Sequence, residues 1–128
     1  MVDLKARPYY LSDEDCQWVK ETIKGMSDEE KVGQLFFQLT SSHDEEYLKE
    51  LKEKYHLGGC RYNPAPGKAI QEQNRKLQKY AKVPVFIACN TEAGGNGACA
   101  DGTYIGNGVK IGATGKEEYA YALGKMSN

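Results

Sequence analysis

Residues 83–92 read Val-Pro-Val-Phe-Ile-Ala-Cys-Asn-Thr-Glu, and this stretch decides the fold class. Seven apolar residues in succession are typical of a strand that is covered on both faces of a parallel sheet. Pro84 has no backbone N–H, so we expect it at the start of the strand. Three polar residues follow at once, and they place Asn90, Thr91 and Glu92 at the carboxyl end of the predicted strand.

Two further strands and several amphipathic helices are predicted before this stretch. Residues 34–39 (Gln-Leu-Phe-Phe-Gln-Leu) indicate a buried strand, and residues 59–63 indicate a short strand that Pro64 ends. Apolar residues at helical spacing predict helices over residues 12–25, 43–56 and 68–81, with a short helix from residue 27. Strands that alternate with helices are typical of βαβ units, so the sequence predicts an α/β fold with parallel strands.

Three helix starts carry capping signals. Ser12 precedes three acidic residues, and Ser27 with Glu30 forms a capping-box pattern, in which the two side chains bind each other's backbone N–H groups. Thr114 and Glu117 repeat that pattern before a final predicted helix. The apolar residues of this last helix share one face: Tyr119, Ala122, Leu123 and Met126.

Glycines are concentrated after the third predicted strand. Residues 94–115 contain eight of the 14 glycines and little apolar periodicity, so we expect a long irregular loop, with residues 94–113 on the active-site side. Residues 95–100 also fit the letters of the dinucleotide fingerprint G-x-G-x-x-A. No helical pattern opens on these glycines, which disfavours phosphate binding.

Charge and composition exclude several classes of protein. The chain has 128 residues, with 17 Lys and Arg against 18 Asp and Glu, so a nucleic-acid partner is disfavoured. The sequence predicts neither a membrane span nor a signal peptide, and we expect a cytoplasmic protein. The four cysteines form no C-x-x-C pair and only two histidines accompany them, so we expect reduced thiols, no metal site and no cofactor.

The core is predicted to be thin. Leu, Ile, Val and Phe make up 23 of the 128 residues. Such a chain has few side chains with which to offset the conformational entropy that folding costs. We therefore expect self-association through an open sheet edge or exposed helix faces.

The candidate site lies where the third strand ends. An amide at Asn90 and a carboxylate at Glu92, followed by glycines, suit a polyol or sugar. The alternative is that Asn90 and Thr91 only cap the end of the strand and Glu92 is solvated. His43 and His56 lie near helix ends, and Cys89 has no base beside it in the sequence, so no residue of the chain is predicted to be catalytic.

Four segments together resemble glycoside hydrolase family 3, the family of β-glucosidases and β-N-acetylhexosaminidases. Residues 25–35 resemble the family's M-[ST]-x-E-E-K-[IV]-G-Q-L entry to the first barrel strand, and residues 57–60 resemble its glycine-led second strand. Residues 83–92 resemble the strand that ends in D-x-E-G-G, and residues 111–125 resemble the helix that follows. The resemblance implies the first three β/α units of a (β/α)₈ TIM barrel, with residues 1–128 as one incomplete domain.

The resemblance also implies a function. Asn90 stands at the position of the motif's aspartate, which binds sugar hydroxyls, and Glu92 matches the motif's glutamate. The family's aspartate nucleophile and its acid/base match no residue here and belong to later parts of the barrel. The implied parent enzyme hydrolyses terminal β-N-acetylhexosaminides or β-glucosides by a retaining mechanism. We expect the isolated chain to be inactive, and the alternative is a non-catalytic carbohydrate-binding or interaction module.

Overall fold

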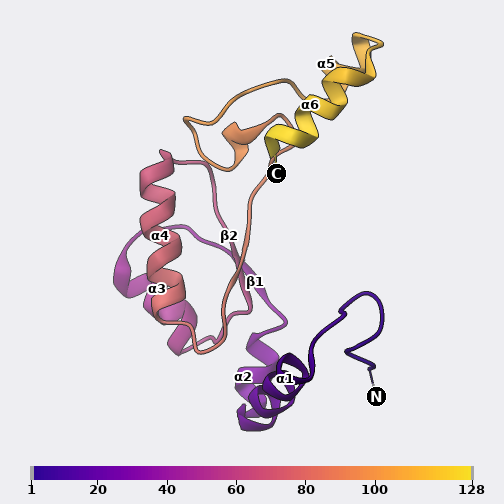
Figure 1. Cartoon of the computed structure of the whole chain (residues 1–128). Coiled ribbons are helices and arrows are strands. Elements are labelled where there is room, and N and C mark those ends of the chain that lie inside the picture. The colour runs from indigo at the N-terminus through magenta and orange to yellow at the C-terminus, as the bar shows by residue number, and fades with distance from the viewer. Residues whose placement is uncertain (1, 128) are drawn as a thin grey trace.

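The computed structural model describes residues 2–127 as an α/β fold with a small parallel sheet (Figure 1). The three strands pair in the order β1-β2-β3, and both pairs are parallel, which confirms the predicted fold class. Within residues 2–127, no helix is long and apolar enough to cross a membrane. The elements along the chain are α1 (Asp13–Gly25), α2 (Asp28–Gly33), β1 (Phe37–Leu39), α3 (Glu45–Glu53), β2 (Gly59–Arg61), α4 (Gly67–Lys79), β3 (Phe86–Ala88), the 3-10 turn η1 (Gly95–Gly97), α5 (Gly108–Ala113) and α6 (Glu117–Ser127).

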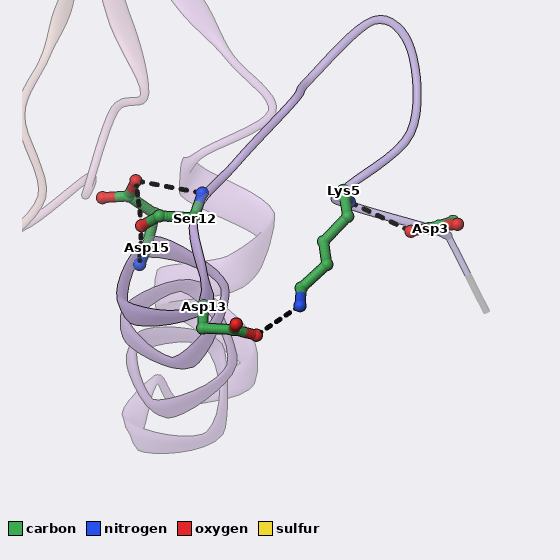
Figure 2. Close-up of polar contacts among 5 residues, drawn as sticks. All are labelled: Asp3, Lys5, Ser12, Asp13 and Asp15. Carbon is green, nitrogen blue, oxygen red and sulfur yellow. Dashed lines mark hydrogen bonds and ion pairs between the residues drawn. The ribbon is translucent and has the colours of Figure 1, made fainter.

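The predicted caps of the first helices are present. The Ser12 hydroxyl accepts a hydrogen bond from the Asp15 backbone at 3.1 Å, and the Asp15 carboxylate accepts from the Ser12 backbone (Figure 2). Ser27 and Glu30 repeat this capping box at the start of α2. Figure 2 also shows Lys5 paired with Asp13, and this ion pair raises the pKa of the lysine and lowers that of the aspartate.

The core lies on the side of the sheet that α3 and α4 cover (Figure 1). Cys60 of β2 is fully buried beneath the two helices, as are Leu48 of α3 and Leu77 of α4. The cluster of buried apolar side chains consists of Leu48, Leu51, Leu57, Cys60, Leu77 and Val85. A cluster of this size agrees with the thin core that the composition predicts.

The opposite face of the sheet is open, which corrects the prediction that the first and third strands are buried. Phe37, Gly59 and Phe86 lie side by side in the register of the three strands. The two phenylalanine rings stack at 6.3 Å between centroids, and both are more than half exposed. They meet because Gly59 has no side chain, since a Cβ there would overlap the Phe37 ring. Consecutive apolar residues indicate that both faces of the sheet must be buried, but residues 2–127 cover only one face.

β1 and β3 differ from the prediction in two further respects. β1 begins at Phe37 rather than at residue 34, because the backbone N–H groups of Leu35 and Phe36 donate to carbonyls of α2. β3 is an edge strand of the sheet, and β2 is the central one. The predicted site therefore follows an edge strand and not the central strand of the sheet.

The glycine-rich segment is shorter than predicted. Its irregular part ends at Asn107, whose side chain caps the six-residue helix α5. Thr114 is the C-cap of α5 and does not start the final helix: its hydroxyl donates to the Ile111 carbonyl at 2.6 Å. α6 follows, and Tyr119 and Met126 of its apolar face remain more than 40% exposed.

A buried lysine is an unexpected part of the core. Lys52 lies on the inner face of α3, where its ammonium donates to the Leu57 carbonyl. Burial lowers the pKa of Lys52, and burial raises the pKa of the neighbouring Cys60 thiol. The long aliphatic stem of Lys52 thus adds to the packing beneath β2.

Candidate functional site at the carboxyl edge of the sheet

Three polar side chains meet where β2 and β3 end. Arg61 is the last residue of β2, and it pairs in register with Ala88, the last residue of β3. Asn90 lies two residues beyond Ala88, and Glu92 follows it. Because parallel strands end at the same edge of a sheet, this register brings Arg61 to the side chains that the sequence singled out.

These three residues form a hydrogen-bonded chain, here called the rim triad (Arg61, Asn90 and Glu92). The Arg61 Nε donates to the Asn90 Oδ1 at 2.8 Å. The Asn90 Nδ2 donates to the Glu92 Oε1 at 2.9 Å. Asn90 and Glu92 are exposed, and Arg61 is half-buried.

The rim triad fixes the orientation of the Asn90 amide, since its oxygen faces a guanidinium and its nitrogen faces a carboxylate. A guanidinium has five N–H donors, and only the Nε–H of Arg61 is used on Asn90. A carboxylate accepts several hydrogen bonds, so Glu92 retains acceptor capacity as well. The edge of the sheet thus presents both hydrogen-bond donors and hydrogen-bond acceptors.

Asn90 and Glu92 lie at the carboxyl edge, as the sequence predicts, while their role in sugar binding stays a prediction. Arg61 is not among the site residues predicted from the sequence. A cation at the last position of a strand was the available signal, but only the strand register shows that it reaches Asn90.

Thr40 ties the end of β1 to this edge. It is buried, and both its backbone N–H and its hydroxyl donate to the Arg61 carbonyl, at 2.7 and 3.2 Å. A polar residue after a predicted strand was the signal here too. Thr40 therefore holds the backbone of Arg61 while the Arg61 side chain binds Asn90.

The glycine loop (residues 94–107) packs directly against the rim triad. A Cβ on Gly97 would overlap the Asn90 carbonyl oxygen and lie 2.5 Å from the carbonyl carbon. Gly94 pairs with Tyr104 in an antiparallel bridge, which closes the loop on itself. The glycines thus serve close backbone packing beside Asn90.

The four cysteines differ in exposure. All four are unpaired thiols, and Cys16 and Cys60 are buried. Burial raises the pKa of Tyr62, and the nearby Cys89 and Cys99 thiols add to this. No group of three or more His, Cys, Asp or Glu residues within residues 2–127 is arranged to hold a metal ion.

A large hollow lies elsewhere, between α2, β1 and α3. Its volume is about 820 Å³, and its lining includes Val32, Phe36, Phe37 and Tyr55. We keep the rim triad as the candidate site, because ligands of parallel sheets bind at the carboxyl ends of strands and the hollow flanks the open β1 edge. The hollow is a partly apolar surface that the described residues leave uncovered.

Known proteins match almost the whole chain. A curated relative from Cellulomonas fimi, named β-N-acetylglucosaminidase/β-glucosidase, is 34% identical over 119 residues, which are 93% of this chain and 21% of the relative. The solved structure of a β-glucoside phosphorylase BglX bound to 2FGlc has 35% identity and a TM-score of 0.82 over 97% of this chain. A second structure of a β-glucoside phosphorylase BglX has 36% identity and a TM-score of 0.78.

The match covers only part of the length of these relatives. The chain spans about a fifth of the length of these relatives: 21% of the curated protein, and 23% and 22% of the two solved chains. No sequence profile of a protein family matches it. Sequence identity and fold nevertheless agree along nearly the entire chain, so it belongs to glycoside hydrolase family 3 and corresponds to the N-terminal part of that family's barrel.

Proposed function

We propose that this chain supplies part of the sugar-binding edge of an enzyme that hydrolyses terminal β-N-acetylhexosaminides or β-glucosides from non-reducing ends. The observation that carries the proposal is the rim triad, which is a set of oriented donors and acceptors at the carboxyl edge of a parallel sheet. The name of the Cellulomonas fimi relative supports the same class of substrate. In this proposal Asn90 and Glu92 bind sugar hydroxyls, and Arg61 orients Asn90.

The proposed mechanism is retaining hydrolysis. It needs a carboxylate nucleophile and a separate carboxylic acid about 5–5.5 Å apart on either side of the scissile bond. The rim triad contains one carboxylate, and Asn90 binds it through its amide. We therefore assign Glu92 to substrate binding and place both catalytic carboxyl groups in later parts of the barrel.

The first test uses the 128-residue chain and its Glu92→Gln variant. We expect no turnover of aryl β-glucosides or aryl β-N-acetylglucosaminides, but weak binding of glucose or N-acetylglucosamine, measured by NMR titration. Gln keeps the shape of Glu92 but loses its charge. A charge-assisted hydrogen bond is about twice as strong as a neutral one, so the affinity is expected to fall about fivefold.

The control for this test is Glu72→Gln, an exposed glutamate on α4. It removes the same charge away from the rim triad and should leave the sugar affinity unchanged. The opposite result would be that the chain turns over substrate and that substitution of one of its own carboxylates abolishes this turnover. This result would contradict the assignment of the nucleophile to a later part of the barrel. Equal sugar affinity in the Glu92 and Glu72 variants would contradict the role of Glu92.

Phosphorolysis is a second candidate reaction, because both solved neighbours are named β-glucoside phosphorylases. The cationic Arg61 at the edge also favours an anionic acceptor over water. Product analysis of a protein that contains this sequence and a complete barrel separates the two. With inorganic phosphate present, phosphorolysis yields a sugar 1-phosphate and hydrolysis yields the free sugar.

A non-catalytic binding module is the remaining alternative. It predicts sugar binding by such a protein without turnover under either condition. The same product analysis therefore separates it from both enzymatic functions.

We further propose that the isolated chain self-associates through its open sheet face. Phe86 on the edge strand β3 is 72% exposed, and its ring stacks on the exposed Phe37. Exposed apolar surface beside an unpaired strand edge favours pairing with a second copy. We expect Phe86→Ser to shift the sedimentation coefficient towards that of a monomer.

The control for self-association is Tyr10→Ser. Tyr10 is 71% exposed, almost the same as Phe86, but it lies before α1 and outside the sheet. This variant should sediment like the original chain. A folded wild-type monomer at high micromolar concentration would refute the proposal.

A further inference from the structure

Helix α4 begins without a cap of its own. Pro66 occupies the N-cap position and offers no side-chain hydrogen bond, whereas α1, α2 and α3 are capped locally by Ser12, Ser27 and Asp44. The Gly67 backbone N–H instead donates to the Asp101 Oδ1 at 2.8 Å. A carboxylate is favourable there, because it satisfies a free N–H at the positive end of the helix dipole. A residue of the glycine loop thus caps a helix that begins 34 positions earlier.

The loop also packs closely on the start of α4. The Ala100 backbone N–H donates to the Ala65 carbonyl at 2.9 Å, next to the Asp101 cap. A Cβ on Gly67 would lie 3.3 Å from the Asp101 Oδ1 and 3.6 Å from the Cys99 Cβ. Two hydrogen bonds and close packing therefore join the segment after β2 to the segment after β3.

The other side of the same loop supports Asn90. The loop is tightly folded, since a Cβ on Gly102 would overlap the Gly95 carbonyl oxygen, and Asn96 N–H donates to the Thr103 carbonyl at 3.4 Å. Gly97, within this fold, lies directly against the Asn90 carbonyl. A displacement of the loop at Asp101 is thereby transmitted to the backbone of Asn90.

We propose that Asp101 is a positioning residue for the rim triad. By capping α4 from the glycine loop, it links the chain that follows Arg61 to the chain that follows Asn90. This link keeps Asn90 within hydrogen-bonding distance of Arg61, at 2.8 Å. The consequence for sugar affinity rests on the proposed function, whereas the consequence for the geometry of Asn90 does not.

The test compares Asp101→Ala with Asp44→Ala in the 128-residue chain. Each substitution removes one aspartate that caps a helix, but Asp44 caps α3. We expect Asp101→Ala to shift the side-chain amide NMR signals of Asn90 and to speed hydrogen exchange in residues 94–107. We expect it to weaken binding of N-acetylglucosamine about tenfold, the factor for one charge-assisted hydrogen bond. Asp44→Ala should lower the melting temperature by a similar amount and change none of these readouts.

Rescue by a conservative variant completes the test. Asn caps helices about as well as Asp, so Asp101→Asn should restore the Asn90 signals and the affinity. Should Asp101→Ala fail to fold, Asp101→Ser, with a shorter acceptor, should give the same changes to a smaller degree. Unchanged Asn90 signals in the Ala or Ser variant, or equal changes in Asp44→Ala, would overturn the proposal. If the wild-type chain binds no sugar, the proposed function fails, but the Asn90 signals and hydrogen exchange still decide the role of Asp101.

Discussion

Gly97→Ala is expected to displace the glycine loop from the rim triad and to abolish measurable sugar binding by the chain. The added Cβ would overlap the Asn90 carbonyl oxygen and would lie 3.3 Å from the Thr91 Cα. The obstacle is backbone, and a Cβ has no rotamer through which to avoid it. Overpacking of this kind costs about 1–3 kcal/mol, and here it acts on the residue that joins Arg61 to Glu92.

The measurement is an NMR titration with glucose, combined with a thermal melt. Gly124→Ala is the matched control, because Gly124 lies in α6 and a Cβ there meets no atom within 4 Å. Alanine is the better helix former by about 1 kcal/mol, so this control should keep the sugar affinity and stabilise α6. Wild-type affinity in Gly97→Ala would show that the loop does not position Asn90.

Leu48→Ala is expected to destabilise the fold by about 3 kcal/mol, within the usual range of roughly 2–5 kcal/mol for such a truncation. Leu48 of α3 is fully buried, and it belongs to a cluster of only six buried apolar side chains. A shift of 1 kcal/mol moves the melting temperature of a small domain by roughly 4–8 °C, so we expect a fall of about 10 °C or more. Circular dichroism during heating measures it.

Leu35→Ala is the control for this substitution. Leu35 is 81% exposed beside β1, so the same truncation there removes little buried surface. We expect its melting temperature to stay within about 4 °C of the wild type, since surface substitutions rarely exceed 0.5 kcal/mol. Similar melting temperatures for the two variants would mean that the core lies elsewhere.

Local signals in the sequence predicted the helix starts and the order of the elements well. Ser12 and Ser27 cap α1 and α2 because a hydroxyl and an acid three residues later satisfy each other's free backbone groups. The prediction was wrong at Thr114, whose hydroxyl donates to the Ile111 carbonyl of α5 and accepts from the backbone N–H of Lys116, not from that of Glu117 in α6. A capping pattern between two adjacent helices does not show which of them it serves.

The α/β class, the parallel strands and the position of Asn90 and Glu92 after the third strand could be predicted from the sequence, because each depends on residues close together in the chain. Only the tertiary structure placed Arg61 on Asn90 and Asp101 on Gly67, contacts that span 29 and 34 residues. It also left Phe37 and Phe86 exposed although their pattern predicts burial. The pattern of apolar residues indicates which faces of a strand or helix must be buried. Strand register and the elements present decide which side chains meet and which faces are covered.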